Sequence, residues 1–287
     1  MKNFKWFSRS WMSMVYLFLY LPIIVLVIFS FNEGRPTRWN GFTLENYTDL
    51  FQNQQVIDGL FASLRVAAIT AVLSVVIGTL IAFVLVRYRG FVGKTLFSGM
   101  ANTPLVMPEV VLGLSLLIVF KDLFKVEGGA YWTIILGHTL LGAAYASVVI
   151  KARLSELSLT YEEAALDLGA RPLQVFFLVT LPMIAQSLMS AALLVFTISF
   201  DDVVIAEFLK GPGVQNLTNM IMNYSRQGTR PVVVALGAMI VFVVSFVLIS
   251  GSIWMQTREK RRHADVAAAF RAATQITVLP SICNLQR

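Results

Sequence analysis

The chain has 287 residues, of which 57% are hydrophobic and 14% charged, and its formal net charge is +7. Its mean hydropathy is +0.72. A soluble domain is about 45–50% apolar and about 25% charged, so this composition excludes an ordinary soluble globular protein and indicates a membrane protein. The single cysteine, Cys283, excludes an internal disulfide framework.

Six apolar segments are long enough to cross a bilayer as helices, since a span needs about 20 such residues. They are residues 11–31, 64–86, 96–120, 131–150, 183–208 and 232–255, which predicts an all-α membrane protein. The first segment is too long for the apolar part of a signal peptide, so we expect an uncleaved span. Pro104 and Pro108 interrupt the third segment. Three glycines are expected to be close-packing points between helices: Gly78, Gly113 and Gly142.

Lys and Arg are distributed unevenly over the two sides of this predicted bundle. With the N-terminus in the cytoplasm, fifteen of the 23 lie on cytoplasmic segments and seven on outer loops. Cytoplasmic loops carry an excess of Lys and Arg, so both termini are predicted to be cytoplasmic. We expect a cytoplasmic N-terminus (1–10), a membrane domain (11–258) and a poorly ordered cytoplasmic tail (259–287). The same bias accounts for the net charge, and no nucleic-acid partner is expected.

A polar segment with the sequence EEAALDLGARPLQVFFLVTLP, residues 162–182, lies between the fourth and fifth predicted spans on the cytoplasmic side. Thr160 and Glu163 match a capping box at a helix start. Apolar residues then follow at helical spacing on one face: Tyr161, Ala164, Ala165 and Leu168. Gly169 is placed for a left-handed helix end. This pattern predicts a short amphipathic helix.

A second short helix is predicted directly after that turn. Pro172 suits its first turn, and Leu173, Phe176 and Phe177 give it an apolar face. It should end before Pro182, because the residue before a proline disfavours helical backbone. An ordinary connector resting on lipid headgroups is the alternative. The acidic residues of the first helix argue against that, since membrane-surface helices are usually rich in Lys and Arg.

The spacing in this segment resembles the EAA loop of bacterial ABC importer permeases, whose pattern is E-A-A-x3-G-x9-I-x-L-P. Only Val179 departs from the pattern, at the position of the Ile. The resemblance implies a type I ABC importer permease fold with six spans, in which a cytoplasmic coupling loop (residues 151–182) docks on a separate ATPase subunit. The residues implied at this ATPase contact are Glu163, Ala164, Ala165, Asp167, Gly169, Leu181 and Pro182.

Three further stretches are similar to the polyamine branch of this family: WNGFTLENYTDLF (39–51), NTPLVMPEVVLGLSLL (102–117) and FTISFDDVVIAEFLKGPG (196–213). The resemblance implies a permease subunit of the bacterial inner membrane for putrescine or spermidine. Its implied partners are a second permease subunit, an ATPase dimer that binds ATP and Mg²⁺, and a periplasmic polyamine-binding protein. The same machine with another cargo (ferric ion, thiosulfate or an amino-acid derivative) remains an alternative. A stand-alone channel or a membrane-embedded enzyme is a more distant one.

Several acidic side chains lie in or near the predicted spans, where a charge is costly and therefore indicates function. The substrate-path candidates are Glu109, Asp201, Asp202, Glu207 and the aromatic Tyr224. Carboxylates would replace part of the hydration of a polycation, and an aromatic ring would add cation–π attraction. The alternative is a helix-end ion pair with Arg65, Lys210 or Arg226.

Nothing in the sequence points to catalysis or to a resident cofactor. The stretch GFVGKTLF (90–97) has Tyr88 where a phosphate-binding loop would need glycine, so ATP is expected to bind another subunit. His138 is expected to hydrogen-bond a neighbouring helix rather than bind a metal. No Ser/His/Asp arrangement is recognisable, so neither catalytic residues nor a metal site are predicted.

Overall fold

The computed structural model describes residues 2–34, 38–88, 90–126, 130–226, 228, 230–246 and 249–250. Within these ranges the chain is helical apart from its connections and one isolated bridge between Asn32 and Phe42, which confirms the predicted all-α class. Two compact units are present and are described separately: Met1–Leu50 with Thr229–Arg287, and Phe51–Gly228. The predicted tail, residues 259–287, lies outside the described residues.

The first unit contains α1 (Lys2–Phe29), the start of α2 (Glu45–Gln52) and a shorter apolar helix, Pro231–Phe246. A buried amide organises the loop between α1 and α2: Asn46 Nδ2 donates to the carbonyl oxygens of Ser30 and Asn32, both at 2.9 Å. The hydroxyls of Ser30 and Tyr47 are hydrogen-bonded at 2.7 Å. These contacts fix the loop because buried backbone carbonyls need partners.

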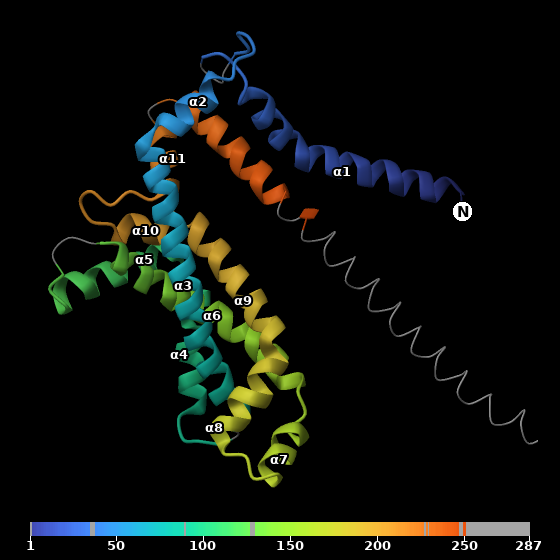
Figure 1. Ribbon diagram of the computed structural model, residues 1–287, viewed down its shortest axis with the longest axis vertical. Helices are drawn as coiled ribbons and strands as arrows, with labels where there is room; N and C mark the ends of the chain where they lie inside the picture. Colours follow the sequence, from blue (N-terminus) through green and yellow to red (C-terminus); the bar gives the residue numbers. More distant parts are fainter. Residues whose placement is uncertain are drawn as a thin grey trace, which may run out of the picture. The chain divides into compact units, whose positions relative to one another are not determined.

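Three long helices form the body of the second unit and pack side by side (Figure 1): α3 (Gln54–Arg87), α6 (Tyr131–Glu156) and α9 (Leu181–Asp201). Asn53 caps α3 by accepting the backbone N–H of Val56 at 3.3 Å. An apolar cluster fills the space between the three helices and consists of Ala71, Ala82, Ala146, Ile150, Leu154, Ile184, Ala191 and Val195. Most of these side chains are small or β-branched, so the helix axes can lie close together.

Glycine sets the helix spacing at three places, as the sequence predicted. A Cβ at Gly78 on α3 would lie 2.7 Å from Ala146 Cβ on α6. At Gly142 it would overlap the Ser74 side chain. At Gly113 it would lie 2.8 Å from the Phe208 ring. The helices could not keep these distances with a larger residue.

The third predicted span is not one straight helix. It consists of α4 (Lys94–Val106) and then α5 (Glu109–Ile118) with a π turn, η1 (Val119–Leu123), and the chain bends by 111° between them. Met107 is extended, with φ −74° and ψ 135°, because Pro108 follows it. Pro104, in contrast, is buried inside α4 without ending it.

Four helices in the described residues are long and apolar enough to cross a membrane, and the bent pair would add a fifth. The predicted fifth span, 183–208, ends earlier than expected: its last helix, α9, ends at Asp201, and α10 (Val204–Leu209) is a separate short helix. The predicted sixth segment, 232–255, extends beyond the described residues. The count of six and the cytoplasmic location of both termini therefore stay predictions.

Candidate functional site

The predicted helix–turn segment lies at the end of the second unit where α3 ends (Figure 1). It contains α7 (Thr160–Asp167), a turn, and α8 (Pro172–Val175). Gly169 has φ +88°; its N–H donates to Leu166 O at 2.8 Å, and Ala170 N–H donates to Ala165 O at 3.1 Å. This pair of hydrogen bonds is a Schellman motif, so the predicted glycine helix end is confirmed.

Two local predictions in this segment are wrong. Thr160 does not cap α7, because it is the first helical residue, and its N–H donates to Ser158 Oγ at 3.3 Å. The second helix does not end before Pro182. It continues through a π turn, η2 (Phe176–Thr180), into α9 as one apolar helix, Pro172–Asp201. The extra residue in the π turn accommodates a proline that cannot donate a helical hydrogen bond.

The surface of α7 is formed mostly by residues that the sequence placed at the ATPase contact. Glu163, Ala164 and Asp167 are exposed, as is Gly169 in the following turn, whereas Ala165 is half-buried. Leu168, also in the turn, is 90% exposed. Leu181 and Pro182 lie on a different element, the first turn of α9. The exposed face combines small residues, which let another backbone approach, with negative charge. We call Glu163, Ala164, Asp167 and Leu168 the α7 face.

The side chain of Glu162, which is next to Glu163 in the sequence, points away from the α7 face and towards Arg87 and Thr180. Its Oε1 accepts hydrogen bonds from Arg87 Nε at 3.0 Å and Nη2 at 2.8 Å, and from Thr180 Oγ1 at 3.0 Å. The Arg87 and Glu162 side chains are 9% and 16% exposed. Sequence reasoning had counted Glu162 with the acidic surface. Only the helical offset of about 100° from Glu163 was available as a signal.

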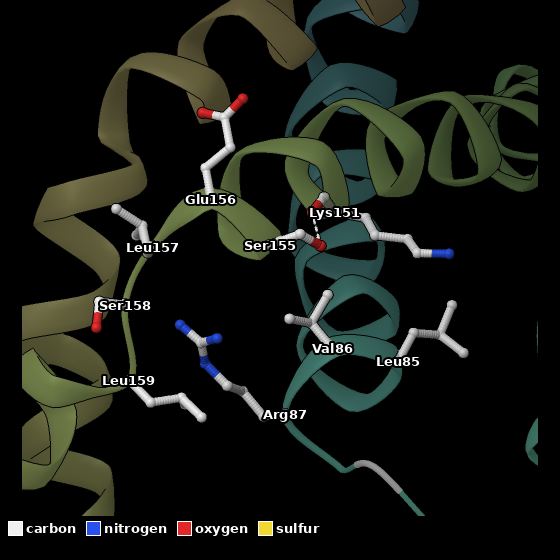
Figure 2. Close-up of a pocket in the computed structure, with 9 residues that line it drawn as sticks. All are labelled: Leu85, Val86, Arg87, Lys151, Ser155, Glu156, Leu157, Ser158 and Leu159. Carbon is white, nitrogen blue, oxygen red and sulfur yellow. Dashed lines mark hydrogen bonds between the residues drawn. The ribbon is translucent and has the colours of Figure 1, made fainter.

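A polar cavity of about 650 Å³ lies beside this contact (Figure 2). The ends of α3 and α6 and the turn of residues 157–159 line it, and it is open to the outside. In Figure 2 the Arg87 side chain extends from the end of α3 towards this turn. The cavity walls carry the hydroxyls of Ser155 and Ser158 and the charged groups of Lys151 and Glu156. This open polar pocket therefore lies where the chain leaves α6, just before α7 begins.

The predicted substrate-path residues do not form one cluster. Glu109, in the first turn of α5, and Asp201, the last residue of α9, are exposed. Glu207 on α10 forms an ion pair with Lys210 at 2.7 Å, which is one of the pairings that the sequence left open. Tyr224 on α11 (Leu217–Arg226) lines a cavity of about 380 Å³ that Lys210 also lines. Contact of any of these residues with cargo stays a prediction.

The Asp202 side chain, in contrast, is only 7% exposed and accepts several hydrogen bonds. Its Oδ2 accepts a hydrogen bond from His138 Nε2 at 2.9 Å, and its carboxylate also accepts the N–H groups of Ala206 at 2.9 Å and Ile205 at 3.4 Å. His138 Nδ1 is hydrogen-bonded to Ser199 Oγ at 2.7 Å. The expected hydrogen bond from His138 to a neighbouring helix is therefore confirmed. Asp202 joins α6 to the start of α10.

Ser199, His138 and Asp202 thus form a hydrogen-bonded Ser–His–Asp series, which the sequence had not revealed because the residues come from separate segments. The adjoining cavity is only about 10 Å³. A single water molecule needs about 10–15 Å³ of such volume, so no substrate fits beside the serine. Within the described residues, no group of three or more His, Cys, Asp or Glu side chains is placed to hold a metal ion.

The apolar helices and the exposed helix–turn segment have the architecture expected of a membrane transport subunit, and comparison with known families identifies the class. Residues 74–263 match the family described as "Binding-protein-dependent transport system inner membrane component", and the chain belongs to this family. It is therefore an inner-membrane transport component. The predicted membership among ABC importer permeases is confirmed.

Two individual relatives and one solved structure show which members of the family this chain is similar to. The chain is 41% identical over 259 residues to the putrescine transport system permease protein PotI of Escherichia coli K12, covering 88% of this chain and 92% of PotI. It is 36% identical to the spermidine/putrescine transport system permease protein PotC of Haemophilus influenzae, covering 85% and 95%. A bacterial alginate ABC transporter solved with a substrate-bound periplasmic protein shares the fold, with a TM-score of 0.66 at 15% identity over 86% and 92% of the chains.

Proposed function

We propose that this chain is a permease subunit of an ATP-driven importer and forms part of the translocation path for a polyamine, putrescine or spermidine. The observation that carries the proposal is the 41% identity to a putrescine permease over 88% of the chain. The exposed α7 face supports the permease role, because it offers a docking surface at the end of a helix bundle. Another cargo carried by the same machine is the alternative outcome.

Three kinds of partner complete the proposed machine. A second permease subunit would close the path. An ATPase dimer, which would bind ATP and Mg²⁺, would hold the α7 face. A periplasmic binding protein would deliver the cargo, as the family description and the alginate transporter's periplasmic protein suggest. This chain would make or break no bond; the cavity of about 10 Å³ beside Ser199 supports that view.

Transport would then follow from shifts between inward- and outward-facing bundles. ATP can bias this equilibrium only through differential affinity for the two states, so the movement of the ATPase subunits must reach the spans mechanically. Cargo must bind the path weakly, since tight binding would prevent release. Glu109 and Asp201 are the first candidates for such weak contacts, because neither carboxylate has a hydrogen-bond or ion-pair partner among the described residues.

The test is ATP-dependent uptake of radiolabelled putrescine and spermidine into vesicles that contain the reconstituted complex. Wild type should import at least one of them. Asp201→Asn should reduce uptake while the ATPase stays bound, and Asp122→Asn, an exposed acidic residue on η1, is its control. Glu163→Lys should weaken ATPase binding, and Glu156→Lys, whose carboxylate is 67% exposed on α6, is its control.

Each outcome separates the parts of the proposal. ATP hydrolysis by the wild-type complex without polyamine uptake would reject the cargo and leave the permease role. Equal ATPase binding by Glu163→Lys and Glu156→Lys would reject the α7 face as the docking surface. Equal uptake by Asp201→Asn and wild type would remove Asp201 from the path.

A further inference from the structure

One carboxylate oxygen connects three separate segments at the end of the second unit. Glu162 Oε1, on α7, accepts two hydrogen bonds from Arg87 and one from Thr180. Arg87 is the last residue of α3, and Thr180 is the last residue of η2. All three donor–acceptor distances are between 2.8 and 3.0 Å. Charge-assisted hydrogen bonds such as these are roughly twice as strong as hydrogen bonds between neutral groups.

Little else holds α7 in place. All eight of its residues are described, and none of them is buried. It packs against α8 and η2, which follow it in the chain. The polar pocket of about 650 Å³ lies nearby, at the ends of α3 and α6 and the turn that precedes α7 (Figure 2). Hydrophobic burial, which normally fixes a helix in a fold, therefore contributes little to its position.

Arg87, in contrast, belongs to a rigid element. Ala82 and Leu85, within the last two turns of α3, are buried, and α3 packs along α6 and α9. Glu162 thus attaches a loosely packed surface helix to one of the three long helices that form the body of the unit.

We propose that Arg87 and Glu162 are positioning residues for energy coupling: their ion pair makes α7 move together with α3 when the ATPase subunits move. This inference rests on the proposed function, since it assumes that the ATPase binds α7. Neither residue needs to touch cargo or ATPase for this role. Loss of the pair should leave the α7 face chemically intact but let it move without the spans.

The first experiment compares ATP hydrolysis with uptake in the reconstituted complex. Arg87→Ala and Glu162→Gln should keep basal ATP hydrolysis and ATPase binding, but the amount of cargo imported per ATP should fall about tenfold, within the usual range of allosteric coupling. Arg153→Ala is the matched control, because Arg153 pairs with Glu156 at the same end but is 45% exposed. It should couple normally. Arg87→Lys should lie between, because lysine keeps the charge and loses the paired donors.

A second measurement does not need the correct cargo. Spin labels at Leu166→Cys on α7 and Tyr88→Cys after α3, with Cys283→Ser, report the distance between the two elements in the complex. In wild type this distance should be narrowly distributed and the same with and without trapped ATP. In Arg87→Ala and Glu162→Gln it should broaden and change with ATP. A double charge swap, Arg87→Glu with Glu162→Arg, should restore part of the narrow distribution.

The inference is overturned if Arg87→Ala and Glu162→Gln match wild type in both measurements. It is also overturned if either variant no longer binds the ATPase while its spin-label distance stays narrow, because α7 would then be correctly placed without the pair. Failure of the proposed function would be visible in the wild-type complex itself, as absent ATPase binding or absent polyamine uptake. The two failures are therefore distinguishable.

Discussion

Asp201 and Asp202 are neighbours in the sequence but have opposite surroundings. Asp201 is exposed at the end of α9, whereas the Asp202 side chain is 7% exposed and holds both His138 and the first turn of α10. A buried carboxylate is tolerated only when it is paired and hydrogen-bonded, and Asp202 meets that condition. At the scale of single residues, the structural role therefore belongs to Asp202, and only Asp201 has a carboxylate left exposed for the predicted contact with cargo.

Two replacements of Asp202 should distinguish its hydrogen bond with His138 from its hydrogen bonds with the start of α10. Asp202→Ala removes both the cap of α10 and the partner of His138, and should destabilise the protein by about 2–4 kcal/mol, the sum of a lost cap and an unsatisfied buried group. Asp202→Asn keeps an acceptor for the cap and should cost about half as much. Thermal unfolding of the purified protein in detergent measures both effects.

Asp201→Asn is the matched control for that series, since the same change is made one residue earlier at an exposed carboxylate. Its unfolding temperature should stay within about 1 °C of wild type, as surface substitutions usually change stability by less than about 0.5 kcal/mol. If Asp201→Asn were as destabilising as Asp202→Ala, the assignment of stability to Asp202 alone would be wrong.

At the scale of elements, some features were readable in the sequence and others were not. The end of α7 at Gly169 was predicted because only glycine adopts φ +88° readily, so a local rule decides it. The continuous helix through Pro182 was not predicted, because a π turn depends on the packing of the whole segment and not on one residue. The contacts of Glu162 and Asp202 were also missed: their partners, Arg87 and His138, are 75 and 64 residues away.

The turn after α7 gives a prediction at this scale. Gly169→Val should strain the turn by roughly 1–2 kcal/mol, because a branched side chain disfavours the left-handed backbone. Gly169→Asn should be tolerated better, since asparagine visits this conformation. In a pull-down of the ATPase subunit, the Gly169→Val variant should retain less ATPase than the Gly169→Asn variant. Equal retention by both would mean that the turn does not set the orientation of α7.

Helix spacing gives a second prediction, with a matched pair of glycines. Gly78→Ala would place a Cβ 2.7 Å from Ala146 Cβ and 2.9 Å from Ser147 N, so α3 and α6 must separate. Gly99→Ala on α4 meets no atom within 4 Å. Gly78→Ala should lower the free energy of unfolding by about 1–3 kcal/mol. Gly99→Ala should leave it unchanged or raise it by up to about 1 kcal/mol, because alanine has a higher helix propensity than glycine. The order of the two unfolding temperatures tests this; the reverse order would contradict close packing at Gly78.

At the scale of the whole molecule, the distribution of Lys and Arg and the number of membrane-spanning helices must be consistent with the same membrane topology. Fifteen Lys and Arg on one side against seven on the other favour two cytoplasmic termini, which requires an even number of spans. The described helices provide four spans, or five with the bent pair, so the segment 232–255 decides the parity. If that segment crosses the bilayer, the C-terminal tail is on the same side as α7.

The single cysteine makes this topology measurable. Cys283 lies in the predicted cytoplasmic tail, so a membrane-impermeant maleimide should label it in inside-out vesicles and not in intact cells. In a Cys283→Ser background, Ala152→Cys at the exposed end of α6, which is predicted to be cytoplasmic, should behave in the same way. Ser225→Cys, exposed near the end of α11 in a predicted outer loop, should be labelled only from outside. Labelling of Cys283 from outside together with Ala152→Cys from inside would mean that residues 232–255 do not cross. The chain would then have an odd number of spans, with α7 still on the cytoplasmic side.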